Sequence, residues 1–282
     1  MVNSRVVGRY LRRLGTAGPG APSVAGLRAL HRAHVERVPY ETLDILLGRP
    51  TTVDPHESVE RVLSGRGGYC FHLNGAFATL LTALGYRVRW HLGGVQPDRA
   101  VPAAADGGHL ALTVECEGGT WFVDVGLGEC LYEPLPLREG TYRQGPFTFG
   151  LEPSAVAPGG WRFHNDPGNG FPGMDFRLEP AGPADFAERH HWLSTAPDSG
   201  FRRFPQAARR HATGLDSLRG CVLLRIDGDH RTSRELATSA EWFGVLSEVF
   251  GLALPEVGAA ERATLWRRTR AAHLAWLEQE AR

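Results

Sequence analysis

The sequence predicts an α+β protein in which the type of secondary structure changes twice along the chain. Helix start and stop signals recur through the first 85 residues, and from Tyr86 onward short apolar runs follow one another in a pattern typical of a β-barrel or sandwich. Helical patterns return after an apolar run near residue 221. At 282 residues the chain is long enough for one large domain or for two to three packed subdomains.

The first part contains four predicted helices. Residues 4–14 form an amphipathic segment, and a second helix spans about 23–38, where Pro39 ends it. A third begins at residues 54–57, where an N-cap acid, a first-turn proline and a glutamate at the third helical position coincide. The fourth spans about 69–85, starting at or just before a cysteine and ending at a glycine that is suited to a C-cap.

The remaining chain is predicted to be mostly strands, with two helices at its end. The predicted strands are 88–95, 109–116, 120–125 and 221–226. The predicted helices are 239–250 and 259 to the end. Glycine- and proline-rich stretches at 17–22 and 97–108 are expected to be loops.

The composition excludes several function classes. All 31 basic residues are arginine, so chemistry that needs a lysine, as in Walker-type phosphate loops, pyridoxal enzymes and kinases, is excluded. Acidic residues also number 31, and this balance argues against nucleic acid as a partner. No apolar run approaches the roughly 18 residues of a membrane span, and the first 14 residues lack a signal-peptide core. We therefore expect no membrane association and a cytoplasmic location.

Among four widely spaced cysteines, Cys70 is the candidate nucleophile. It follows Arg66-Gly67-Gly68-Tyr69, so a tight glycine turn delivers the thiol to the first turn of a helix, where the amide dipoles favour a thiolate. The alternative is that Cys70 is a small buried hydrophobe. The other three, for which a structural role is expected, are Cys116, Cys130 and Cys221. No C-x-x-C pair is present, so zinc-ribbon and thioredoxin-like sites are not predicted.

His109 and Asp124 stand at the ends of neighbouring predicted strands. If Gly118-Gly119 forms a two-residue turn, Thr113 lies opposite Asp124. His109 then lies on the same face of the sheet as Asp124, but four residues along the strand from Thr113. Four residues of strand span about 13 Å, which is too far for contact without a bend. The register alone therefore does not bring the two side chains together, and each remains open to interpretation as a polar residue at a strand end.

Several motifs together resemble the arylamine N-acetyltransferases. The motifs are 66–71 (RGGYCF), Gly85-Tyr86, His109 at a strand start, 124–128 (DVGLG), 30–34, 38–44 and 193–201. The resemblance covers roughly residues 10 to 255. It implies a cysteine-protease-like core with a helical domain (1–85), a β-barrel domain (86–195) and an α/β lid (196–282). It also implies that Cys70, His109 and Asp124 meet at their junction.

In this family an acyl group is carried on the cysteine as a thioester, with ping-pong kinetics. By resemblance, Cys70 attacks the donor thioester, His109 is its ion-pair partner and general base, and Asp124 orients the imidazole. Backbone amides near Cys70 and Gly126 are candidates for an oxyanion site. The residues expected to support the site or bind substrate are Arg66, Gly68, Tyr69, His72, Gly126, Leu127 and Phe201.

The sequence departs from the family pattern at three positions. His72 stands where an acid is usual two residues after the nucleophile, Thr42 replaces an asparagine, and Leu127 replaces a phenylalanine. Loss of the acid would remove an ion-pair partner of Arg66. His72 is then either a structural replacement or a second base beside the thiolate.

The His72 departure, together with segments 161–167 and 173–176, resembles actinobacterial relatives in natural-product pathways. Some of those look like Dieckmann cyclases that release tetramate or pyridone scaffolds, and others like amide synthases that close macrolactams. The leading hypothesis is accordingly release and cyclisation of a chain from an acyl or peptidyl carrier-protein thioester. A carbon acid would lose its proton to His109 or His72, with no bound cofactor.

The main alternative is an acetyl-coenzyme A-dependent arylamine N-acetyltransferase. A noncatalytic binding module and a Cys-His-Asp amidase or peptidase are further readings. An arginine-rich stretch would meet an acidic carrier protein or the phosphates of coenzyme A, or would be a solvated face; it comprises Arg202, Arg203, Arg209, Arg210 and Arg219. No metal site is predicted, because His190-His191 point apart and the His31/His34 pair lacks a third ligand.

Overall fold

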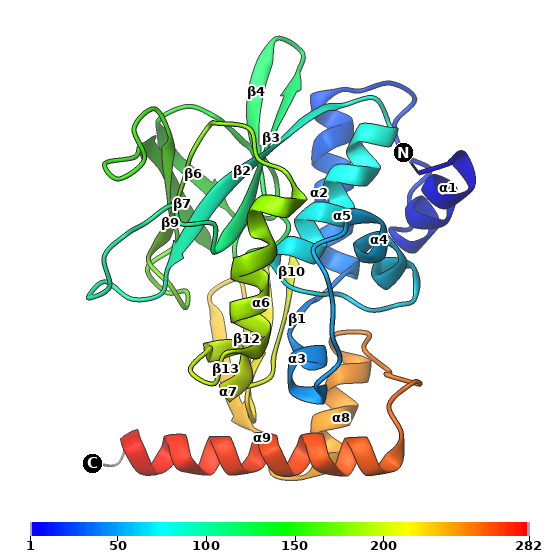
Figure 1. The fold of residues 1–282 in the computed structure, drawn as a ribbon, viewed down its shortest axis with the longest axis vertical. Coiled ribbons are helices and arrows are strands. Elements are labelled where there is room, and N and C mark those ends of the chain that lie inside the picture. Colours follow the sequence, from blue (N-terminus) through cyan, green and yellow to red (C-terminus); the bar gives the residue numbers. More distant parts are fainter. Residues whose placement is uncertain (1, 281–282) are drawn as a thin grey trace.

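The computed structural model describes residues 2–280 and contains two β-sheets with helices around them (Figure 1). The first sheet has eight strands, and the second has five. Figure 1 shows the N-terminal helices beside the larger sheet, the smaller sheet between that layer and the C-terminus, and one long helix across the end of the molecule. No helix in the described part of the chain combines the length and the apolar character of a membrane span.

The four predicted N-terminal helices are confirmed. They are α1 (Ser4–Arg13), α2 (Val24–Arg37), α4 (Pro55–Leu63) and α5 (Cys70–Ala83). Each of the first three begins at a residue whose side chain accepts a first-turn amide: Asn3, Ser23 and Asp54. A five-residue helix, α3 (Leu43–Leu47), lies between α2 and α4 and was not predicted, because it is too short to show a periodic pattern.

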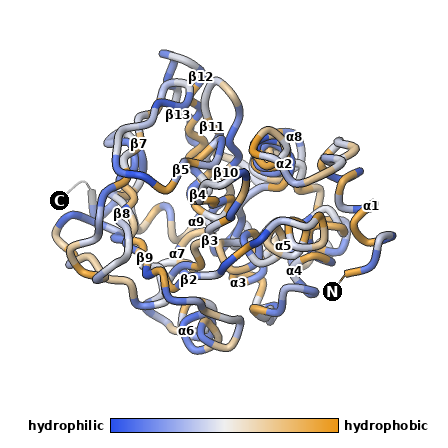
Figure 2. Tube along the Cα trace, turned by 90° about the horizontal axis from the view of Figure 1, so that it is seen from above, coloured by the Kyte–Doolittle hydropathy of each residue, from blue (hydrophilic) through white to orange (hydrophobic). Residues whose placement is uncertain are grey.

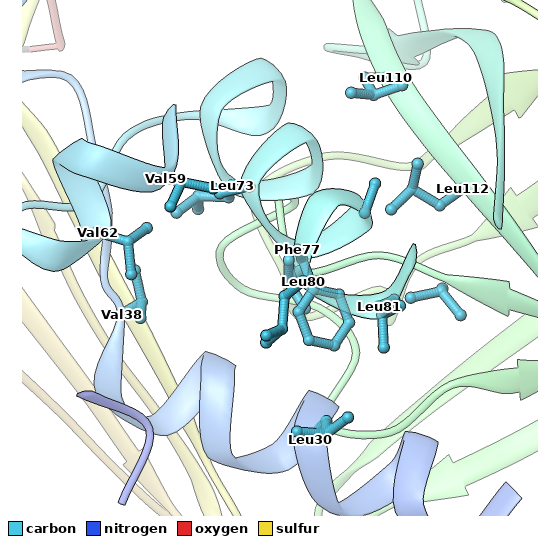
Figure 3. Close-up of a cluster of buried hydrophobic side chains, with 14 of the residues drawn as sticks. Leu30, Val38, Val59, Val62, Leu73, Phe77, Leu80, Leu81, Leu110 and Leu112 are labelled. Atoms are coloured by element: carbon cyan, nitrogen blue, oxygen red, sulfur yellow. The ribbon is translucent and has the colours of Figure 1, made fainter. Parts of the chain in front are cut away.

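Helix α5 lies inside the molecule and is apolar on nearly every side. Figure 3 shows Phe77 and Leu80 packed between Leu30 of α2 and the strand that carries Leu110 and Leu112. Full burial of each such side chain contributes about 1.5–3 kcal/mol relative to exposure. The helix that begins at Cys70 is therefore fixed by packing along its length rather than by its own capping.

The eight-stranded sheet curls into a nearly closed barrel in which all neighbouring strands are antiparallel. Its order is β5-β4-β3-β2-β9-β8-β7-β6. The strands are β2 (Arg87–Gln96), β3 (His109–Cys116), β4 (Gly119–Val123), β5 (Leu135–Pro136), β6 (Gly140–Gln144), β7 (Phe147–Pro153), β8 (Trp161–His164) and β9 (Gly173–Phe176). Its interior contains aromatic side chains in contact, among them Phe122, Phe149, Phe163 and Phe176.

The turn between β3 and β4 differs from the prediction. Cys116 pairs with Gly119, so the turn residues are Glu117 and Gly118, with φ of 50° and 75°. Positive φ at both positions is the conformation that matches the twist of a two-residue hairpin. The predicted Gly118-Gly119 turn was one residue too late, and this shifts the pairing by two residues along the partner strand.

The five-stranded sheet has the order β1-β10-β11-β12-β13 and draws its first strand from the N-terminal part of the chain. Its strands are β1 (Tyr40–Glu41), β10 (Gln206–His211), β11 (Gly214–Arg219), β12 (Val222–Asp227) and β13 (His230–Glu235). Only β12 was predicted. Strand β13 has the sequence HRTSRE, is exposed throughout and carries hydrophilic colours in Figure 2, so it lacks the apolar alternation of a recognisable strand.

The last strand of the barrel ends at Phe176, and the predicted 86–195 domain is helical from Pro183 onward. This helical stretch consists of η1 (Pro183–Phe186) and α6 (Ala187–Thr195), and a short helix α7 (Gly200–Arg203) follows. The chain ends with α8 (Ser239–Glu248) and α9 (Ala259–Glu280), which confirm the last two predicted helices. Because β1 pairs with β10, the N-terminal part and the segment predicted as a lid (196–282) share one sheet.

Candidate active site

Cys70 is the first residue of α5, and it borders a cavity of about 510 Å³. The turn that precedes it has no room for side chains: a Cβ on Gly67 would come 1.8 Å from the carbonyl oxygen of Pro39, and one on Gly68 would come 2.6 Å from Cβ of His72. Tyr69, the N-cap residue, makes no side-chain capping bond to the first-turn amides of α5. The glycines in the turn thus allow the thiol to sit at the positive end of a buried helix.

His109 and Asp124 are in direct contact despite the separation expected from the sequence. Nε2 of His109 donates to Oδ2 of Asp124 over 2.6 Å, and both side chains are buried. In the observed register Leu112 pairs with Val123, and Asp124 is the next residue after Val123. Asp124 is therefore two residues closer to His109 along the strand than the predicted register had placed it. Because the turn comes one residue earlier than predicted, His109 and Asp124 are close enough to form a hydrogen bond.

The electrostatics of this pair favour an imidazolium. Burial alone would lower the pKa of His109, but the charges of Asp124 and Cys70, with the hydrogen bonds they make to the ring, raise it to about 10. Cys70 therefore interacts with the same imidazole that Asp124 holds. The arrangement places a cationic imidazolium next to the Cys70 sulfur, with Asp124 holding the ring.

Asn74 is a site residue that the sequence reasoning missed. Its Nδ2 donates to Oδ1 of Asp124 over 2.9 Å and to the carbonyl of Leu110 over 2.7 Å, while its Oδ1 accepts the amide of Val125 over 2.9 Å. It lies one helical turn after Cys70 and so on the same face of α5. That spacing was a readable signal, and it makes one helix carry both the thiol and the group that anchors the carboxylate.

Gly126 lies against the nucleophile, but its amide is engaged. The amide donates to Oδ1 of Asp124 over 2.8 Å, so it is not free to bind a carbonyl oxygen, contrary to the expectation of an oxyanion site there. A Cβ on Gly126 would come 2.6 Å from Cα of Cys70, and this close approach is what requires glycine. Leu127, the next residue, lines the cavity and packs into the barrel core.

The cavity lies where the barrel, α6 and the five-stranded sheet meet. Of the residues singled out from the sequence, Cys70, His109, Gly126, Leu127 and Phe201 line it, whereas Arg66, Gly68, Tyr69 and His72 do not. Its other walls come from the 97–108 loop, from α6 and from β10 and β11; they include Val101, Asp106, Arg189, Trp192, Ala208 and Arg219.

Arg66 is buried and fully paired. Its guanidinium lies 2.9 Å from Glu41, 3.1 Å from Asp44 and 2.7 Å from Glu256. Burial opposes the charge, but these carboxylates outweigh it and raise the pKa of Arg66. Arg66 therefore has three carboxylate partners even though position 72 carries no acid. Glu41 and Asp44 also bind Arg61, so Arg66 belongs to an ionic network that anchors the glycine turn.

His72 does not line the cavity and packs against the nucleophile turn at Gly68 and Tyr69. Its ring meets Tyr69 edge-on with centroids 4.6 Å apart and lies near His190. Burial, reinforced by nearby positive charge, lowers the pKa of His72 well below its usual value, so it is a neutral side chain. Its position fits the structural reading and does not fit that of a second base beside the thiolate.

Tyr69 links the nucleophile turn to α6. Its hydroxyl donates to Nδ1 of His190, 2.5 Å away, and Nε2 of His190 donates to the carbonyl of Thr51 over 2.7 Å. The Tyr69 ring also packs edge-on against Phe201, with centroids 5.1 Å apart. The turn, the cavity wall and α6 are thereby held in one arrangement.

The remaining histidines and arginines make mostly structural contacts. His31 lies between the carbonyls of Tyr132 and Asp124, and His34 contacts the hydroxyl of Tyr10. No cluster of three potential metal ligands exists among residues 2–280. Arg210 is buried and donates to backbone carbonyls, including that of Cys130. The predicted arginine stretch is thus not one surface; Arg203 and Arg219 instead border a second cavity of about 650 Å³ next to the first.

Comparison with known proteins identifies the family. A family model described as N-acetyltransferase matches residues 23–258. The arylamine N-acetyltransferase of Escherichia coli is 30% identical over 257 residues, covering 89% of this chain and 90% of that protein. The chain belongs to the arylamine N-acetyltransferase family.

Two further likenesses bear on chemistry within the arylamine N-acetyltransferase family. The structure of the Mycobacterium marinum arylamine N-acetyltransferase in complex with CoA has a TM-score of 0.82 and 28% identity, and it covers 93% of this chain and 98% of that one. Proansamycin X synthase of Amycolatopsis mediterranei is 34% identical over 140 residues, which is 48% of this chain and 54% of that protein. The chain is an acyltransferase of this family, and the α+β prediction is confirmed.

Proposed function

We propose that the protein transfers an acetyl group from acetyl-coenzyme A to an aromatic amine through a thioester on Cys70. The observation that carries this proposal is the buried His109–Asp124 pair set against Cys70 at the wall of the 510 Å³ cavity. The full-length likeness to arylamine N-acetyltransferases supports it and favours this reading over the chain-releasing cyclase that the sequence suggested. The donor is inferred from the CoA complex of the Mycobacterium marinum protein.

Each residue then has a chemical role. The Cys70 thiolate attacks the donor carbonyl, and the His109 imidazolium gives its proton to the leaving thiolate of coenzyme A. The amine next enters the cavity, attacks the thioester and loses its proton to the now neutral His109, and the acyl carbon–sulfur bond breaks to release Cys70 as a thiolate. Asp124 keeps the imidazole oriented and stabilises its charged form, and no bound cofactor is needed.

The proposal is tested by incubating the protein with acetyl-coenzyme A and an aromatic amine or hydrazine. We expect N-acetylation at micromolar donor, ping-pong kinetics and an acetyl adduct on Cys70 when the amine is omitted. Cys70→Ala should abolish turnover, whereas Cys116→Ala and Cys221→Ala should retain it. An acetyl adduct on any other residue, or full activity of Cys70→Ala, would end the proposal.

A second candidate is release of a chain from an acyl or peptidyl carrier-protein thioester, by amide formation or Dieckmann cyclisation. Two observations favour it: the half-length likeness to Proansamycin X synthase, and the 650 Å³ cavity that shares Glu129, Ser217 and Arg219 with the first. Such a site would give a long acyl chain room beyond Cys70. Failure to acetylate amines, combined with acylation of Cys70 by a long-chain carrier-protein thioester, would favour this candidate.

A further inference from the structure

Tyr40 is held at a fixed position beside the nucleophile turn. The amide of Glu41 donates to the carbonyl of Gly68 over 2.9 Å, and Tyr40 itself pairs with Gly68 on one side and with Ala208 on the other. Because Gly68 precedes Cys70 by only two residues, the backbone of Tyr40 cannot move without moving the nucleophile turn.

The Tyr40 ring is also constrained. A Cβ on Gly128 would come 3.2 Å from Cγ of Tyr40, so the ring lies across the loop that follows Asp124. Tyr40 and Cys70 both line the 510 Å³ cavity. The phenol is therefore held between the two segments that carry the nucleophile and the carboxylate.

The hydroxyl of Tyr40 differs from those of the other tyrosines. The chain has six tyrosines, and within residues 2–280 five of their hydroxyls bond to protein groups; these are Tyr10, Tyr69, Tyr86, Tyr132 and Tyr142. In the same described part of the chain the Tyr40 hydroxyl has no such partner, and Tyr40 is one of the residues that line the cavity. A hydrogen-bond donor beside a nucleophile is thus left for a substrate.

Burial, together with nearby charge, keeps this phenol protonated and therefore a hydrogen-bond donor. Burial first, and then the neighbouring charge of Cys70, raise the pKa of Tyr40 well above its usual value, so the proton stays on the oxygen. The nearby carboxylate of Glu129 is already engaged: it accepts the hydroxyl of Ser217 over 2.6 Å and the amide of Gly170 over 3.3 Å.

Acyl transfer at Cys70 needs donors where negative charge develops on the carbonyl oxygen. The amide of Gly126 is bound to Asp124, whereas the Cys70 amide, in the first turn of α5, has no intrahelical acceptor. We propose that the Tyr40 hydroxyl is a further catalytic group, which together with the Cys70 amide binds the oxyanion of the tetrahedral intermediate. This inference rests on the proposed acyl-thioester function.

The step balances without a further reactant. The Cys70 sulfur bonds to the acyl carbon, and the carbonyl π pair moves to the oxygen, which accepts hydrogen bonds from Tyr40 and the Cys70 amide. Collapse restores the carbonyl and breaks the bond to the donor's leaving atom, which takes a proton from the His109 imidazolium. Tyr40 keeps its own proton throughout.

The test is Tyr40→Phe, which removes one oxygen and keeps the ring that packs on Gly128. Single-turnover acylation by p-nitrophenyl acetate should slow by about 10²- to 10³-fold, the usual loss for one oxyanion donor. Alkylation of Cys70 by iodoacetamide should proceed at the wild-type rate, because displacement at a saturated carbon forms no oxyanion. Tyr142→Phe, whose hydroxyl donates to the carbonyl of Arg138 away from the cavity, is the matched control and should leave both rates unchanged.

Two outcomes would overturn the assignment. Acylation of Tyr40→Phe at the wild-type rate would mean that the hydroxyl does not touch the reacting carbonyl. An equal fall in acylation and alkylation would mean that Tyr40 acts on the thiol rather than on the oxyanion. The ester needs neither coenzyme A nor an amine, so this test is separate from the identity of donor and acceptor. If the ester leaves Cys70 of the wild type unmodified, the acyl-thioester function itself fails.

Discussion

The side-chain amide of Asn74 lies 2.9 Å from Oδ1 of Asp124, on the opposite oxygen from the one that binds His109. One carboxylate thus connects the nucleophile helix to the imidazole that acts on Cys70. The contact sets the spacing between an α-helix and a β-hairpin that approach from different parts of the fold.

The Asn74 contact predicts a loss of both stability and rate. Asn74→Ala leaves the buried Val125 amide without its acceptor and removes one of the two hydrogen bonds to Oδ1 of Asp124. The cost is about 1–3 kcal/mol in the free energy of unfolding. We expect acylation of Cys70 to slow as well, because the carboxylate is no longer held. Asn3→Ala removes the exposed N-cap of α1 at a similar cost of about 1 kcal/mol and is the control. Equal acylation rates in the two variants would contradict the role of Asn74.

Asp124→Asn should change the pH dependence of Cys70 reactivity. Asp124 contributes to the pKa of about 10 at His109, so without its charge the imidazolium loses its proton at lower pH. At pH 8 the thiolate would then lack its cationic partner, and alkylation by iodoacetamide should slow relative to the wild type. The rate should be measured from pH 5 to 10. An unchanged profile would show that the carboxylate does not control the imidazole.

Two buried histidines predict acid sensitivity. Burial lowers the pKa of His31 to about 4 and that of His34 to about 3, so both stay neutral in the folded protein. Between the unfolded value near 6.5 and these values the unfolded chain binds more protons, so the free energy of unfolding should fall as the pH falls through that window. Urea unfolding at pH 7 and pH 5 measures the slope. His34→Gln should reduce the slope, and the exposed His56→Gln should not.

His72→Leu is predicted to have little effect on chemistry. The side chain is neutral, buried and outside the cavity, so a replacement of similar volume should change the free energy of unfolding by less than about 1.5 kcal/mol. Ester acylation of Cys70 should remain close to the wild-type rate. A large, pH-dependent loss of acylation without loss of stability would restore His72 as a second base.

Local signals in the sequence predicted most of the helices. The N-cap acid Asp54 and the helix-ending Pro39 are signals that act within a few positions, and the structure confirms the helices that they start and end. Strands with apolar alternation, such as β3, were equally readable, whereas the charged β13 and the two-residue β1 were not. Strand β1 depends on β10, which lies far away along the chain, whereas β13 is placed by its hairpin with β12.

The assembly of the site was not predictable from local pattern. Whether His109 reaches Asp124 depends on which two residues form the turn between their strands, and Glu117 at positive φ gives no strong signal. The predicted strand register kept His109 and Asp124 apart, and only the resemblance to the family predicted that they meet. The paired state of Arg66 and the position of His72 depend on Glu256 and His190, which lie in other parts of the chain.

Because β1 pairs with β10, this sheet can form only after β10 has been synthesised. Cys70, His109 and Asp124 all leave the ribosome before Gln206–His211, so the thiol exists for a time without the sheet that completes its cavity. Until then Tyr40 has only Gly68 to pair with, and contacts so distant along the chain form slowly. In a nascent chain stalled before β10, Cys70 should therefore react with any electrophile in solution. In the complete chain, an electrophile reaches Cys70 only through the cavity.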